Sequence, residues 1–174
     1  DSGSLEKYKL NFLVIGHATI EQGGIVNIEN KGFGGKSRGP GRAISIAEIN
    51  GKATPIGSAY AGMGGHYLNK PYGSILHPFS LGSAGYDTDD AFGGGAIKLF
   101  ASGDIVINGT INAKGTASAY DPGTGGSIWI SGASVSGKGK LSVRSESSGA
   151  DYKWKSSAGR IAVYQTENIG WDDF

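Results

Sequence analysis

Aromatic side chains occur in segments of the carboxyl-terminal half where apolar residues alternate with others. Side chains of a β-strand point alternately to its two faces, so Trp129 points outward if Ile128 and Ile130 point into a core. Aromatic rings beside polar groups can stack on the apolar faces of sugars. The predicted ligand-binding residues are Lys98, Phe100, Trp129, Tyr152, Trp154 and Tyr164. In the alternative interpretation, Trp129 and Tyr164 pack beneath the long segment between Phe33 and Phe92.

Three carboxylates, Asp87, Asp89 and Asp90, share one short segment. Calcium takes about six to eight oxygen ligands, and these side chains could supply several, with Asp104 or Asp121 as further candidates. The spacing begins like an EF-hand loop but lacks its glycine and its terminal glutamate. Ca²⁺ is therefore the one cofactor that the sequence suggests, and solvated turn aspartates are the alternative.

Catalytic patterns are missing from the sequence. The predicted outward strand positions hold no pair of carboxylates, which glycoside hydrolysis needs about 5 to 9.5 Å apart. His17, His66 and His77 are dispersed, and neither an H-E-x-x-H motif nor a serine nucleophile motif occurs. The sequence therefore predicts a protein that is not an enzyme and has no catalytic residues.

A repeat of about constant length would position these side chains. Segments 94–99, 125–130 and 158–163 each read small residue, glycine, variable residue and alternating strand. Their first isoleucines, Ile97, Ile128 and Ile161, are 31 and 33 residues apart.

A second strand recurs inside the unit, at residues 109–113, 139–143 and 24–28. Short strands in a unit of this length are what one turn of a β-solenoid requires, because no unit buries its inner face alone. Stacking predicts three columns of core residues. They are Ile97, Ile128 and Ile161; Leu99, Ile130 and Val163; and Val26, Ile111 and Leu141.

Composition agrees with a β-rich chain. Glycine accounts for 32 of 174 residues, and each interior glycine costs a helix about 1 kcal/mol relative to alanine. We therefore predict an all-β fold, a single β-solenoid domain over residues 1–174 that is a fragment of a larger protein. Residues 33–92 break the repeat and form a long glycine-rich excursion, which we expect to fold over one flank.

Charge and hydropathy exclude two classes of partner. The 16 basic and 15 acidic side chains leave a net charge of +1 without a basic stripe, so no nucleic-acid partner is expected. The longest apolar stretch, residues 12–15, is far shorter than a transmembrane segment. The absence of cysteine leaves the compartment open.

Eight glycine-containing pieces, in their order along the chain, resemble very large glycine-rich bacterial surface proteins, and some eukaryotic extracellular proteins, with pectin-lyase-like or filamentous-haemagglutinin-like β-helical modules. They are residues 18–24, 62–66, 72–74, 81–85, 93–97, 108–111, 126–130 and 159–164. The resemblance implies a right-handed parallel β-helix, a cell-surface or extracellular location, and a role in adhesion, matrix building or glycan contact. Residues 151–157 depart from the pattern, because they are polar where a glycine run is expected.

Three functions follow from these patterns. The first is a non-catalytic surface module that binds glycans or other extracellular matrix components. The second is a purely structural spacer or self-assembly unit whose partners are neighbouring repeats of the parent protein. The third is a polysaccharide lyase or hydrolase, since β-helices also host such enzymes.

Overall fold

The computed structural model of the chain consists of strands, turns and extended segments. The described residues are 9–34, 38–45, 55–64, 69–85, 90–116, 122–146 and 155–166. Over these ranges all regular structure is β-strand, and three of the four sheets are parallel. The chain is strand-rich, as predicted. No helix that could cross a membrane occurs in these ranges.

Three successive passes of the chain, which we call coils 1, 2 and 3, each contain three strands. Coil 1 contains β1 (Lys9–Val14), β2 (Ala18–Ile20) and β3 (Ile25–Asn27). Coil 2 contains β6 (Ala96–Ala101), β7 (Ile105–Ile107) and β8 (Thr110–Asn112). Coil 3 contains β9 (Ser127–Gly132), β10 (Val135–Ser136) and β11 (Lys140–Ser142), and β12 (Arg160–Gln165) follows it.

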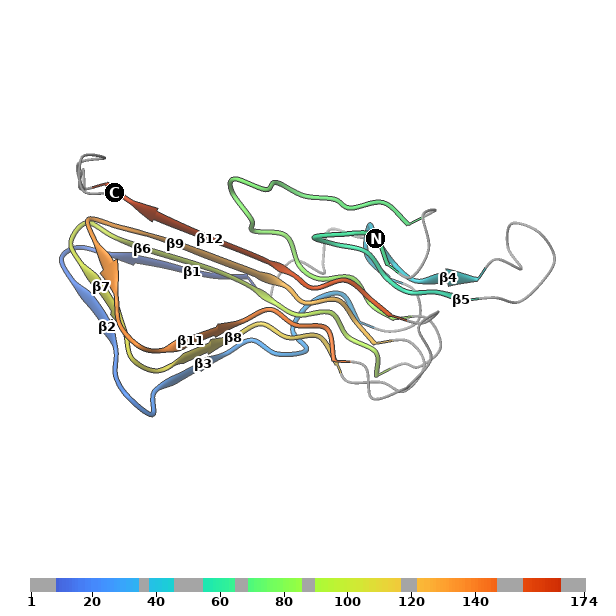
Figure 1. The fold of residues 1–174 in the computed structure, drawn as a ribbon, viewed down its shortest axis with the longest axis horizontal. Helices are drawn as coiled ribbons and strands as arrows, with labels where there is room; N and C mark the ends of the chain where they lie inside the picture. Colours follow the sequence, from blue (N-terminus) through green and yellow to red (C-terminus); the bar gives the residue numbers. More distant parts are fainter. Residues whose placement is uncertain are drawn as a thin grey trace.

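Equivalent strands of the coils pair in parallel. Sheet A has the order β1-β6-β9-β12, sheet B the order β2-β7-β10, and sheet C the order β3-β8-β11. Figure 1 shows the three sheets around one interior, with sheet A along the top, sheet B at the left and sheet C below. Corners between strands use left-handed glycines, such as Gly16 with φ 100° and Gly23 with φ 83°.

The strand registers confirm the predicted alignment of the repeats. Ile97 pairs with Ile128, and Ile128 pairs with Ile161. Leu99, Ile130 and Val163 form the neighbouring column. Val26, Ile111 and Leu141 form the column of sheet C. These side chains face the interior, where Ile128, Ile130 and Ile111 are fully buried.

The last strand does not share this burial. Ile161 and Val163 are in the predicted register, but they are 42% and 44% exposed. The prediction that both belong to the buried core is therefore wrong. The physical reason is that β12 pairs with β9 on one side, and no described strand pairs with its other side.

Between sheets C and A the chain runs in extended glycine-rich segments that touch through their backbones. The amide of Gly94 donates to the carbonyl of Thr124 at 2.8 Å, and the amide of Gly126 donates to that of Ala113 at 2.8 Å. A Cβ added to Gly126 would lie 1.8 Å from the carbonyl oxygen of Gly95. The glycines that directly precede β6, β9 and β12 are therefore required by close approach of the coils.

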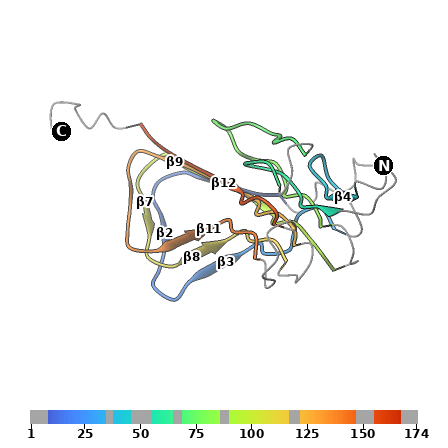
Figure 2. The ribbon, with the colours of Figure 1, turned by 45° about the vertical axis from the view of Figure 1, so that its right-hand side comes forward.

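The described parts of the excursion of residues 33–92 lie beside the outer face of sheet A, as both ribbon views show (Figures 1 and 2). These parts include a two-stranded antiparallel sheet, formed by β4 (Ile44–Ser45) and β5 (Pro55–Ile56). The guanidinium of Arg160, on β12, donates to the carbonyls of Tyr72 and Gly73 at 2.7 and 2.8 Å. These bonds join the excursion to the edge of sheet A.

Candidate functional site

The outer face of sheet A carries four of the six residues that the sequence singled out, and its side chains form three rows across the strands. The first row includes Ala96, Ser127 and Arg160, the second Lys98, Trp129 and Ala162, and the third Leu13, Phe100, Ser131 and Tyr164. The excursion covers these rows to different extents. The side chains that solvent or a ligand can reach on this face therefore differ from one row to the next.

The first row is covered and joined to the excursion. Tyr60 is fully buried, and its hydroxyl hydrogen-bonds with Oγ of Ser127, which also donates to the carbonyl of Ser80 at 2.6 Å. Arg160 lies with its guanidinium carbon 5.0 Å from the centre of the Tyr60 ring. Tyr60 and Ser127 are buried, Arg160 is half-buried, and all three have hydrogen-bond partners. This row therefore joins the excursion to sheet A.

A second tyrosine continues this buried network. Tyr72 donates its hydroxyl proton to the carbonyl of Leu81 at 2.6 Å and accepts a hydrogen bond from Ser83 at 2.8 Å. Its ring centroid lies 4.7 Å from that of Tyr60. Burial raises the pKa of both tyrosines above the usual value of 10, because the phenolate would be charged in a poorly solvated site. Both hydroxyls therefore stay protonated at neutral pH.

The second row is half covered, and Trp129 is its centre. The imidazole of His77, in the excursion, lies 5.0 Å from the Trp129 ring between centroids. Nζ of Lys98 lies 4.4 Å from the Trp129 ring centroid, within the range of a cation–π contact. The indole Nε1 is buried and has no hydrogen-bond partner. Trp129 thus packs against two neighbours of its own chain, as the alternative interpretation expects for this residue.

The third row is open, and we call Leu13, Phe100, Ser131 and Tyr164 the outer strip. Its three large side chains are 67%, 41% and 36% exposed. Tyr164 donates its hydroxyl proton to the carbonyl of Leu76 at 2.6 Å, and its ring lies 6.3 Å from that of His77. The strip therefore presents two aromatic rings with a serine between them and an exposed histidine beside them.

Of the six predicted ligand-binding residues, Lys98, Phe100, Trp129 and Tyr164 share one face of sheet A. Tyr152 and Trp154 lie outside the described residues. Sequence reasoning missed the contribution of His77 because it lies in a segment without strand periodicity. The only signal for it was the expectation that the excursion covers a flank.

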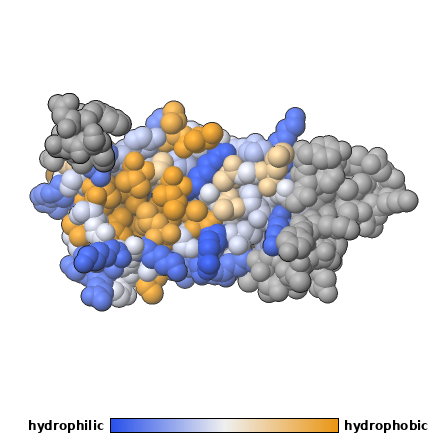
Figure 3. Space-filling view, in the orientation of Figure 1, coloured by the Kyte–Doolittle hydropathy of each residue, from blue (hydrophilic) through white to orange (hydrophobic). Residues whose placement is uncertain are grey.

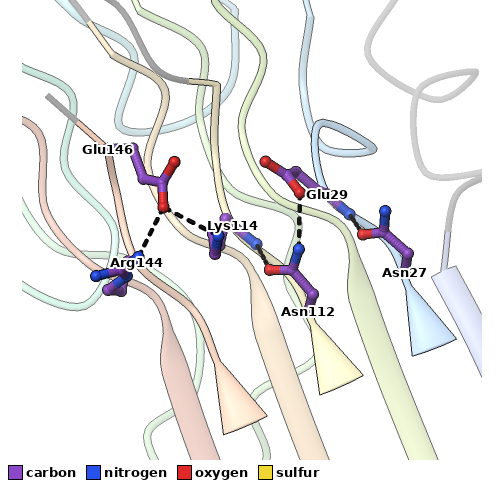
Figure 4. A network of polar contacts seen from close by, with 6 residues as sticks. All are labelled: Asn27, Glu29, Asn112, Lys114, Arg144 and Glu146. Atoms are coloured by element: carbon purple, nitrogen blue, oxygen red, sulfur yellow. Dashed lines mark hydrogen bonds and ion pairs between the residues drawn. The ribbon is translucent and has the colours of Figure 1, made fainter. Parts of the chain in front are cut away.

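Alternating charges form a network at the ends of the sheet C strands (Figure 4). Lys114 and Arg144 contact the carboxylate of Glu146 at 3.0 and 2.8 Å, and Glu29 accepts a hydrogen bond from Asn112 at 2.7 Å. The hydrogen bond from Lys114 is the main cause that lowers the pKa of Glu146. Each charge has a partner at a solvated edge, so the network stabilises the turns.

Two asparagines of this network occupy equivalent positions in coils 1 and 2. Oδ1 of Asn27 accepts the amide of Glu29 at 3.0 Å, and Oδ1 of Asn112 accepts the amide of Lys114 at 3.3 Å. Such bonds imitate a backbone turn. The matching spacing of asparagine and charged residue could have revealed this network in the sequence.

The predicted calcium ligands cannot be brought together from the described residues. Asp87 and Asp89 lie outside the described ranges, while Asp90 is described and exposed. Among the described residues, no group of three or more His, Cys, Asp or Glu side chains could hold a metal ion. Asp104 instead contacts Nδ1 of His17 at 3.2 Å.

Comparison with known proteins does not identify a family for this chain. The chain matches no protein-family model, no curated protein and no solved structure.

Proposed function

We propose that the chain forms part of a right-handed parallel β-helix. Support comes from the three parallel sheets, each of which takes one strand from each coil. Connections between parallel strands of one sheet are right-handed in about 98% of cases. The sequence resemblance to glycine-rich surface proteins points the same way and suggests a cell-surface or extracellular location.

Within this fold, we propose a non-catalytic module that contacts glycans through the outer strip. The observation that carries this proposal is the exposure of Phe100 and Tyr164 in one outward row, on strands separated by β9. Neighbouring strands are about 4.8 Å apart, so the backbone positions that carry the two rings are about 9 to 10 Å apart. A linear glycan that crosses the strands would stack a sugar on each ring, while Ser131 and His77 offer polar groups to its hydroxyls.

A glycan array with the purified chain tests this proposal. Phe100→Ala and Tyr164→Ala should each weaken binding at least tenfold, because each removes a stacking surface. Ile25→Ala is the matched control, since Ile25 is 69% exposed but lies on sheet C. Equal binding by all three folded variants would exclude the outer strip as the site.

The same array run with calcium and then with a chelator separates two modes of binding. Binding that survives chelation supports stacking on the outer strip. Binding that is lost on chelation would assign the contact to a calcium site and make Asp87, Asp89 and Asp90 its first candidate ligands.

A purely structural spacer is the second candidate function. The observation that favours it is the packing of Trp129 against His77 and Lys98, which uses the largest aromatic ring of the face for internal contacts. A folded chain that binds no glycan in either array would support the spacer and exclude the glycan-binding module.

A further inference from the structure

A short loop of the excursion, residues 73–77, runs over the outer face of sheet A, and we call it the covering loop. Its base is fixed at the first row, where Arg160 donates to the carbonyl of Gly73 at 2.8 Å. Its tip reaches the outer strip, where Tyr164 donates its hydroxyl proton to the carbonyl of Leu76 at 2.6 Å. Figure 1 shows the loop in green above sheet A. The loop therefore spans the second row, which lies between these two attachments.

The tip of the covering loop is held loosely. All five residues of the loop are exposed, and Ile75 and Leu76 are 75% and 65% exposed. Figure 3 shows hydrophobic side chains at its upper edge, where the tip of the loop lies in Figure 1. After Gly73, the bond from Tyr164 is the one hydrogen bond that joins this described loop to the strands of sheet A. Segments that bury few apolar groups open at low free-energy cost, so the tip can lift while its base stays in place.

The contact that the loop makes with Trp129 leaves one polar group unsatisfied. The imidazole of His77 lies 5.0 Å from the Trp129 ring, between centroids. The indole Nε1 is buried and has no hydrogen-bond partner. An indole N–H can only donate, and a buried donor without an acceptor destabilises the state that contains it. A ligand that replaces the imidazole and brings an oxygen acceptor can remove this destabilisation.

Trp129 is also positioned to extend the outer strip. It lies on β9, between the strands that carry Phe100 and Tyr164, and two residues before Ser131 of the strip. Two residues of a strand span about 6 to 7 Å, so the three aromatic positions form a triangle on one face of the sheet. With His77 displaced, Trp129 would therefore add a third ring to the stacking surface.

Lys98 supplies a polar group at the same position. Its Nζ lies 4.4 Å from the centroid of the Trp129 ring, and it forms no ion pair with any described residue. An ammonium group has three hydrogen-bond donors and no acceptor. A sugar that stacks on Trp129 would therefore find a donor for its hydroxyl oxygens beside the ring.

We propose that a glycan displaces His77 and stacks a sugar on Trp129, so that the covering loop competes with the ligand for this ring. This displacement rests on the function proposed above, because the same glycan occupies the outer strip. Trp129 is then a third stacking position, and His77 weakens binding. In a site confined to the outer strip, His77 would instead contribute a polar contact, so its removal has opposite effects in the two cases.

Titration of the purified chain with a glycan that binds it on the array tests this proposal. His77→Ala should tighten binding about three- to tenfold, because the sugar no longer has to displace the imidazole. A double variant that also carries Trp129→Leu should lose this gain, because leucine keeps an apolar side chain but removes the ring. Ile75→Ala is the matched control, since Ile75 belongs to the same loop and is 75% exposed, and it should leave the affinity unchanged.

Fluorescence quenching by acrylamide tests the covering of Trp129 without any ligand. In a background of Trp154→Phe and Trp171→Phe, Trp129 is the one tryptophan that remains. His77→Ala should increase the quenching of its fluorescence, because it removes the side chain that packs against the indole ring. Ile75→Ala should leave the quenching unchanged.

Four results would overturn the proposal. Glycan binding that His77→Ala weakens or leaves unchanged would exclude the displacement and keep the outer strip as the site. A gain that persists in the double variant would show that the sugar does not stack on Trp129. Equal quenching with and without His77 would show that the loop does not cover the ring. Absence of glycan binding in every variant would contradict the function proposed above as well.

Discussion

Tyr60 and Tyr72 make the stability of the protein sensitive to alkaline pH. Burial raises the pKa of both hydroxyls above the value of 10 that the unfolded chain retains. Above pH 10 the unfolded state therefore releases protons first, and folding stability should fall as pH rises, by at most about 1.4 kcal/mol per pH unit for each tyrosine. Urea unfolding at pH 8 and pH 11 measures this loss.

Tyr72→Phe provides the test of that assignment. The variant should lose less stability than the unchanged protein between pH 8 and pH 11, because one buried hydroxyl no longer titrates. At pH 8 it should be less stable, because it lacks the bonds to Leu81 and Ser83. An unchanged loss between the two pH values would show that Tyr72 does not cause the alkaline sensitivity.

Single residues also show how far sequence reasoning reached at the candidate site. Alternation along β9 predicted the face on which Trp129 lies, because strand geometry is local. It did not predict that His77 lies against the indole ring, since that contact depends on the path of an irregular segment. On the same face, Trp129 is partly covered by His77 of the excursion, whereas Phe100 is 41% exposed. Alternation along the strands does not predict this difference.

At the scale of elements, the glycines that directly precede β6, β9 and β12 should tolerate no side chain. Gly126→Ala would bring a Cβ within 1.8 Å of a backbone oxygen of the neighbouring coil. Overpacking typically costs about 1 to 3 kcal/mol, and a rigid backbone neighbour places this site at the upper end. The free energy of unfolding, from urea titration, measures the loss.

Gly62→Ala is the matched control for this substitution. An added Cβ at Gly62 meets nothing within 4 Å, and alanine restricts the unfolded chain, so a gain of about 0.4 to 1 kcal/mol is expected. Equal losses in the two variants would mean that conformational preference, and not close approach, explains the glycine of the repeat.

The strand pattern of the repeat was predictable for sheets A and C and incomplete for sheet B. The recurring isoleucines fix the register of β6, β9 and β12, because stacked coils align equivalent positions. Sheet B was missed, although its strands are about as short as those of sheet C. Each strand of sheet C directly follows a glycine, which marks it in the sequence, whereas one or two other residues separate β2, β7 and β10 from the glycine before them.

At the scale of the whole molecule, protection from hydrogen exchange should decrease from the middle of the stack toward its ends. Strands β6 and β9 have partners on both sides, while β1 and β12 have a described partner on one side. Local opening therefore costs least at the ends. Amide exchange measured by mass spectrometry should be slowest in β6 and β9. Faster exchange there than in β1 and β12 would contradict this order.

The aligned columns of Leu10, Ile97, Ile128 and Ile161 also determine how such a chain can change in length. Each coil meets its neighbours through nearly the same set of positions, so duplication of one coil would create an interface that the molecule already contains. Gene duplication of about one repeat could therefore lengthen the rod without redesign of its interior. The number of coils would then set the distance between the outer strip and the two ends of the stack.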